Sequence, residues 1–156
     1  MTSGRSDTKR RFPRIPGSWW LWTFLLQAAY CGTTDPEGAV KESDLTPLTV
    51  LEDAFTNSKY DIQILQEGRI TTILPDDTVG SNHQRFILEL LNQQTLLVSH
   101  NIDLAPRVRS PVLGVTLRFY GEYEWNDRGG VIHWTHRDPN GIHIDGWLEY
   151  EGKRYQ

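Results

Sequence analysis

The last three of the five histidines lie close to a carboxylate, in a pattern that suits metal binding. His136 and Asp138 are two residues apart, so on a strand both side chains would point to the same face. Turn residues 139–141 would then bring His143 back toward them. Neutral imidazoles and a carboxylate bind zinc and similar divalent ions, so we expect His136, Asp138 and His143 to form a metal site. The alternative is that His133 and His136 only form hydrogen bonds within the domain.

A second group of polar residues lies at the ends of two expected strands and suits catalysis by proton transfer. His83 and Arg85 would hold an anionic group of a substrate. His100 and Asp103 would orient that group or act as acid and base, so these four residues are the predicted catalytic set. The alternative for Arg85 is a surface arginine or an ordinary salt bridge to Glu89.

Aromatic residues gather in the last third of the chain and offer surfaces for bases or sugars. We expect the substrate-binding residues to be Asn101, Tyr123, Trp125 and Trp134. The alternative is that the aromatic side chains fill the core of a small β protein.

Composition and motifs narrow the function classes. With 38% hydrophobic and 23% charged residues, the chain has the composition of an ordinary globular protein. Its single cysteine permits no internal disulfide. Residues 41–156 carry eleven Lys and Arg against seventeen Asp and Glu, a net charge of −6, which weighs against broad coating of nucleic acid. No glycine-rich phosphate loop, dinucleotide fingerprint or Gly-x-Ser-x-Gly nucleophile motif is present.

The hydrophobic pattern predicts one helix followed by strands. Thr46 is the expected N-cap and Pro47 the first helical residue, with the helix ending near Asn57. From residue 61 the period changes to two, first in a strand bent around Gly68. Further strands are expected at 85–91, 95–100, 115–124, 131–136, 146–150 and 153–155. We expect a mainly β fold, a small five- or six-stranded barrel of the oligonucleotide/oligosaccharide-binding (OB) type, with one N-terminal helix.

The N-terminal segment has the features of an export signal. Five basic residues precede an apolar run of about a dozen residues that ends at Cys31. We interpret residues 1–31 as a signal peptide or N-terminal membrane anchor, 32–45 as a linker, and 46–156 as one β-barrel domain. The protein is therefore expected to be exported: periplasmic, anchored to the envelope or secreted. Any membrane contact would be made by the N-terminal segment alone.

Several longer strings resemble a family of small exported bacterial proteins known only as a domain of unknown function. The resemblance spans about residues 48–156 and implies a location in the bacterial envelope or outside the cell. It brings no activity, cofactor or catalytic residue. The strings are Asp76-Asp77, His83-Gln84-Arg85-Phe86, His100-Asn101-Ile102-Asp103, Gly121-Glu122-Tyr123-Glu124-Trp125, the segment from Gly129 to His136, and Asp138-Pro139.

The paired carboxylates Asp76 and Asp77 offer a second cation site, for which calcium is the natural ion. The same part of the chain is loosely similar to secreted thermonucleases, in which acids and arginines surround a calcium ion and a phosphodiester. By that analogy Asp76, Asp77, Arg85, Asp103 and Arg107 would form such a site. The alternative is that Asp76 and Asp77 form a solvated turn.

Three functions follow from these patterns. The first is a hydrolase of phosphodiester or similar bonds that depends on a divalent metal, zinc or calcium. The second is a non-catalytic binding module for a glycan, a nucleic acid or an envelope partner. The third is a scaffold whose polar strings only support the fold. We favour the hydrolase, because ionisable side chains recur at strand ends and turns, where sites form.

Overall fold

A computed structural model describes residues 41–156, which form a mainly β unit. The proposed signal or anchor, 1–31, and most of the linker, 32–45, lie outside the described residues. The end of the linker contains a short 3₁₀ helix, η1 (Glu42–Asp44). Among the described helices, none is long and apolar enough to cross a membrane.

The expected helix is present as α1 (Leu48–Thr56), with Asn57 as its C-cap. It buries Leu51 and Ala54 in the hydrophobic core. The predicted N-cap is wrong, because the hydroxyl of Thr46 accepts a hydrogen bond from the backbone N–H of Leu65 instead (3.0 Å). The backbone N–H of Thr46 also donates to the carbonyl of Leu65 (2.6 Å), so this residue ties the start of the helix to the first strand.

Seven strands form one sheet in the described part of the chain: β1 (Ile62–Asp77), β2 (His83–Glu89), β3 (Thr95–Asn101), β4 (Thr116–Glu124), β5 (Val131–His133), β6 (Trp147–Tyr150) and β7 (Lys153–Tyr155). The mainly β fold with a short helix is confirmed. Each of the seven expected strand segments contributes a strand to this sheet, which therefore has more strands than the five or six expected for the barrel. The strand order is β1-β2-β3-β5-β4-β6-β7, and β1 also pairs with β4. Strands β1, β2, β3, β5 and β4 therefore close into a ring, in which β3 and β5 are parallel.

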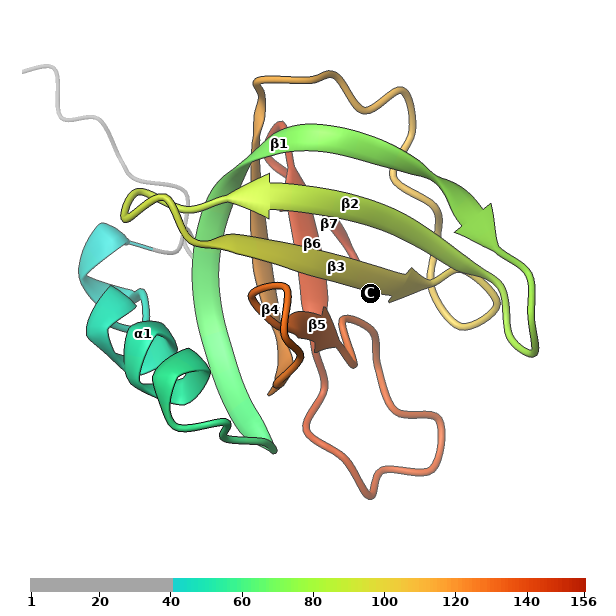
Figure 1. The fold of residues 1–156 in the computed structure, drawn as a ribbon. Coiled ribbons are helices and arrows are strands. Elements are labelled where there is room, and N and C mark those ends of the chain that lie inside the picture. Colours follow the sequence, from blue (N-terminus) through green and yellow to red (C-terminus); the bar gives the residue numbers. More distant parts are fainter. Residues whose placement is uncertain (1–40) are drawn as a thin grey trace, which may run out of the picture. The chain divides into compact units, whose positions relative to one another are not determined.

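The expected bend in the first strand is what closes the ring. Figure 1 shows β1 curving from the direction of β4 into that of β2 and β3. Its first half pairs with β4 and its second half with β2, and the change falls at Arg69, next to Gly68. A Cβ atom on Gly68 would lie 3.0 Å from the Cβ of Leu88, so the close approach of β1 and β2 favours glycine there.

Strand β5 is much shorter than expected. The sequence suggested a strand over 131–136, whereas the structure ends it at His133. The reason is the backbone of Trp134, whose φ of +51° lies in the left-handed region that does not continue a strand. The residues after His133 consequently leave the sheet, and the two-residue alternation predicted through His136 does not apply.

Candidate metal centre and groove

Alternation along β4 places two glutamates on the outer face of the ring. Gly121 and Tyr123 are buried on the inner face, whereas Glu122 and Glu124 are half-buried on the other. Strand β5 pairs with β4 so that His133 lies directly opposite Glu122. Because opposite residues in a sheet have neighbouring side chains, the imidazole of His133 lies beside both carboxylates.

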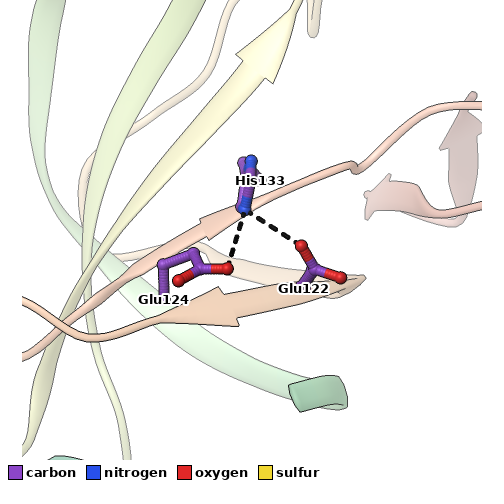
Figure 2. Close-up of side chains that lie close together, drawn as sticks. All are labelled: Glu122, Glu124 and His133. Carbon is purple, nitrogen blue, oxygen red and sulfur yellow. Dashed lines mark ion pairs between the residues drawn. The ribbon is translucent and has the colours of Figure 1, made fainter. Parts of the chain in front are cut away.

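Three donor atoms converge at this point, as Figure 2 shows. The Nε2 atom of His133 lies 3.4 Å from Oε1 of Glu122 and 3.8 Å from Oε1 of Glu124. All three donors lie within 4.8 Å of one another. Ligands bound tetrahedrally at about 2.0–2.1 Å from a zinc ion are roughly 3.4 Å apart. The distance from His133 to Glu122 equals that spacing, and the distance from His133 to Glu124 exceeds it by 0.4 Å.

The Nε2 atom of His133 is shielded from solvent and, within the described residues, has no hydrogen-bond partner. Burial lowers the pKa of His133, although the charge of Glu122 opposes that shift. Burial also raises the pKa of Glu124, and the nearby Asp61 raises it further. A neutral imidazole and two crowded carboxylates form a donor set that a divalent cation would satisfy.

The loop after β5 returns a second histidine to the same glutamates. Nε2 of His143 lies 2.7 Å from Oε2 of Glu122, and its Nδ1 lies 2.9 Å from the carbonyl oxygen of Ile144. Both ring nitrogens therefore face acceptors, which requires an imidazolium ion. Burial opposes this charge, but the bonds to Glu122 and Ile144 raise the pKa of His143. The ring also stacks on Trp134 at 4.2 Å with an angle of 7° between the planes.

A groove of about 300 Å³ on the outer face of β2, β3 and β5 has one of the three donors, His133, in its lining. His133 belongs to both features, so an ion at the centre would lie at the edge of the groove. The groove is lined by His83, Ser99, Asn101, Leu104, His133, Trp134 and His136.

The family model described as "Protein of unknown function (DUF3465)" matches residues 39–156. The chain belongs to this family. A search of curated proteins found no match. The resemblance to a family of unknown function that the sequence strings suggested is thus confirmed, and the DUF3465 match contains the whole described structure, including the centre and the groove.

Within this DUF3465 region, the structure does not bring His136, Asp138 and His143 together as metal ligands. The carboxylate of Asp138 accepts hydrogen bonds from the backbone N–H groups of Asn140, Ile142 and His143, and these bonds lower its pKa. It organises the loop, while His143 turns toward Glu122 and the nearly buried His136 lines the groove. The prediction depended on a strand continuing through His136, which the backbone of Trp134 prevents.

The four predicted catalytic residues are placed differently from one another. His83 lines the groove. Arg85 donates through Nε and Nη2 to the carbonyl oxygen of Pro75. The carboxylate of Asp103 accepts from the backbone and side chain of Asn82, and these bonds lower its pKa.

The fourth, His100, is fully buried. Its Nδ1 accepts from the hydroxyl of Thr135 (2.9 Å) and its Nε2 donates to the carbonyl oxygen of Pro106 (3.1 Å). Burial lowers the pKa of His100 to about 4, so the ring is neutral. Of the four, only His83 lines the groove beside the donors.

The predicted substrate-binding residues divide in the same way. Asn101 and Trp134 line the groove, although His143 covers one face of the indole. Tyr123 is fully buried, and its hydroxyl donates to the carbonyl oxygen of Gly129. The indole N–H of Trp125 donates to the carbonyl oxygen of Phe55, so this tryptophan fixes the end of α1.

The sequence reasoning missed Glu122 and Glu124, although two signals pointed to them. Two-residue alternation along the expected strand 115–124 places Glu122 and Glu124 on the same face as Arg118. Residues 126–130, Asn-Asp-Arg-Gly-Gly, also have the composition of a hairpin turn between the expected strands 115–124 and 131–136, and such a turn pairs the second strand with the first and brings His133 alongside. Both signals concern pairing between strands, and a search for short motifs does not detect them.

Proposed function

We propose that this protein is an exported hydrolase of phosphodiester or similar bonds that binds a divalent metal ion through Glu122, Glu124 and His133. The observation that carries the proposal is the meeting of three donor atoms, within 4.8 Å of one another, at the edge of a groove. Catalytic zinc sites use three protein ligands and keep a further position for water or substrate. A bound metal ion lowers the pKa of such a water, which supplies a nucleophile near neutral pH.

The remaining polar residues of the groove would act on the substrate. His83 and His136 line it beside His133, and imidazole is the side chain best suited to proton transfer near neutral pH. His143 would act through Glu122, since its ring holds the carboxylate oxygen that does not face His133. Partners on metal-bound carboxylates fix their orientation and tune the ion. In this proposal the metal ligands, the acid–base groups and the positioning residue are different side chains.

The second candidate is a non-catalytic binding module, and the strand order favours it. We propose that the ring corresponds to an OB-type barrel, supported by the pairing order β1-β2-β3-β5-β4-β1 and by the parallel pair β3–β5. Barrels of that type bind oligonucleotides and oligosaccharides on the face of strands 2 and 3. The groove described above lies on that face.

Metal titration and turnover separate the two candidates. The full chain, purified without a metal resin, is titrated calorimetrically with zinc and assayed with bis(4-nitrophenyl) phosphate. We expect one ion per chain and turnover that chelation removes, with both reduced at least tenfold in Glu122→Gln and His133→Gln. Glu149→Gln, a half-buried glutamate on β6, is the matched control and should retain both. Zinc binding without turnover would favour the binding module, and no zinc binding would reject the hydrolase.

A further inference from the structure

A second pocket lies on the same outer face as the groove. Its volume is about 210 Å³, and its lining combines aliphatic side chains with two arginines. The lining residues are Leu74, Arg85, Ile87, Thr95, Leu96, Leu97, Asn126, Arg128 and Gly130. The metal centre and its groove do not use this pocket.

The strand register shows that the pocket follows directly after the groove. Three half-buried pairs succeed one another along β2 and β3: His83 with Asn101, Arg85 with Ser99, and Ile87 with Leu97. The first pair lines the groove and the last lines the pocket, with Ser99 on the groove side and Arg85 on the pocket side between them. Each step of two residues along a strand is roughly 7 Å, so one elongated ligand can occupy both.

The pocket has an apolar floor and hydrogen-bond donors at its rim. Leu74, Ile87 and Leu97 supply the aliphatic surface. Asn126 accepts two backbone N–H groups through Oδ1, which leaves its amide NH₂ as a donor. Arg128 is exposed. Arg85 is held by the carbonyl oxygen of Pro75, and its Nη1 lies 3.8 Å from Asp77.

We infer that this pocket holds one nucleobase of a single-stranded nucleic acid whose backbone continues into the groove, with Arg128 binding a phosphate. The inference rests on the proposed function, since it names the phosphodiester that the metal centre would meet. A base has apolar faces and polar edges, which match the aliphatic floor and the donors of the rim. The base must be unstacked to enter, so a duplex does not fit.

Two other classes of ligand, a phospholipid and a sugar, match the pocket less well. Arg85 and Arg128 both line this pocket of about 210 Å³, whereas an acyl chain needs a longer and wholly apolar path. Sugar rings need many hydrogen-bonding partners, and the floor consists of aliphatic side chains.

The net charge of −6 in residues 41–156 makes the binding of nucleic acid weak and dependent on local arginines.

Binding is measured separately from turnover, by fluorescence anisotropy of a labelled oligothymidylate with the full chain in EDTA. We expect saturable binding that weakens as salt increases. Arg128→Gln should weaken it roughly three- to tenfold and lower the slope of log K against log salt by about one. Ile87→Ser, which shortens the floor, should also weaken binding at least threefold while melting near the wild-type temperature.

Two control variants make the same kinds of substitution at exposed positions outside the pocket. Arg109→Gln takes one exposed arginine from the segment between β3 and β4, and Leu91→Ser changes a leucine that is 88% exposed. Both should bind like the wild type. Equal weakening by Arg128→Gln and Arg109→Gln would reduce the effect to net charge and overturn the assignment of the pocket.

The remaining outcomes distinguish this inference from the proposed function. Zinc-dependent turnover of bis(4-nitrophenyl) phosphate without oligothymidylate binding would leave the hydrolase standing and reject the nucleobase pocket. Oligothymidylate binding that depends on Arg128, without any turnover, would support the pocket and reject the hydrolase. Binding of phosphatidylglycerol vesicles with the same dependence on Arg128, and none of oligothymidylate, would assign the pocket to a lipid and overturn the inference.

Discussion

The two halves of the outer face of β4 use charge in opposite ways. In the first half, Arg118 lies between two carboxylates, 2.7 Å from Glu67 and 3.4 Å from Glu149. In the second half, Glu122 and Glu124 lie on the same face two residues apart, and the ion pairs that they form are with histidines. One strand therefore carries a cation between anions at one end and two crowded anions at the other.

We interpret the charges of the first half as supporting the fold and the carboxylates of the second half as suited to binding a ligand. An arginine between two glutamates satisfies donors and acceptors without any further group. The imidazolium of His143 balances only one of the two neighbouring carboxylates, Glu122, and the imidazole of His133 between them is neutral. The remaining repulsion is a cost that a fold tolerates mainly at functional sites. The comparison predicts that changes in the first half reduce stability alone, and that changes in the second half reduce metal binding.

The largest effect is expected at Gly121, on the inner face of β4 next to Glu122 of the candidate metal centre. A Cβ atom there would lie 2.5 Å from the carbonyl oxygen of His133 and 2.8 Å from Cγ2 of Thr135. Gly121→Ala must therefore push β5 away from β4, and we expect a loss of about 3 kcal/mol in unfolding free energy together with loss of zinc binding. Urea denaturation and zinc titration measure the two effects. Gly68→Ala, beside the other half, should cost less and leave zinc affinity intact, since its nearest contact is 3.0 Å.

The next effect concerns Glu124, which the comparison treats as a ligand without a structural task. Glu124→Gln should lower zinc affinity roughly a hundredfold, because one of three charged or lone-pair donors is replaced by an amide. The metal-free protein should melt at the same temperature or slightly higher, since burial and Asp61 already disfavour the ionised form of Glu124. Calorimetric titration and thermal melting test both statements. A clear fall in melting temperature would show that this glutamate supports the fold and would break the comparison.

The third effect extends the comparison to histidines, since His100 is buried with both nitrogens bonded whereas Nε2 of His133 has no hydrogen bond in the described structure. The pKa of His100 is about 4 in the folded state against the ordinary 6.5 of an unfolded chain. Its neutral form is required for folding, so stability is complete above pH 6.5 and is lost as the pH falls toward 4. We expect unfolding free energy to drop by about 2 kcal/mol between pH 7 and pH 5 from this group.

Urea denaturation at several pH values measures that drop. His100→Gln removes the titrating group, so its stability, although lower at pH 7, should vary less between pH 7 and pH 5 than that of the wild type. An equal dependence in both proteins would assign the effect to other groups.

Much of the fold was predictable because it depends on local patterns. The helix near residue 48, the bend at Gly68 and the strands up to Glu124 follow from apolar periodicity and turn residues, which a single sequence displays. The end of β5 was not predictable in this way. A left-handed tryptophan is uncommon, and the contacts that hold Trp134 there come from a loop returning on itself.

The site was less predictable than the fold for the same reason. The predicted metal site combined residues close in sequence, such as His136 and Asp138, which the structure does not bring together. The structure combines residues across a strand pair, Glu122 with His133, and gives Asp138 the backbone amides of its own loop. A carboxylate beside free backbone N–H groups in a tight turn usually binds them first.

The smallest effect is expected from the first half of β4, around Arg118. Arg118→Gln removes two ion pairs on a partly exposed face and leaves Glu67 and Glu149 close to each other, so we expect a loss of about 1 kcal/mol in unfolding free energy. The loss should shrink in high salt, which screens the repulsion between the two carboxylates. Arg109→Gln is the matched control, because this exposed arginine forms no ion pair within the described residues and its loss should cost less. Zinc affinity should stay unchanged in both variants, since Arg118 lies four residues, roughly 13 Å, from Glu122 along the strand. A fall in zinc affinity in Arg118→Gln would mean that the two halves of the strand act as one charge network, and the separation of structural from ligand-binding charges would fail.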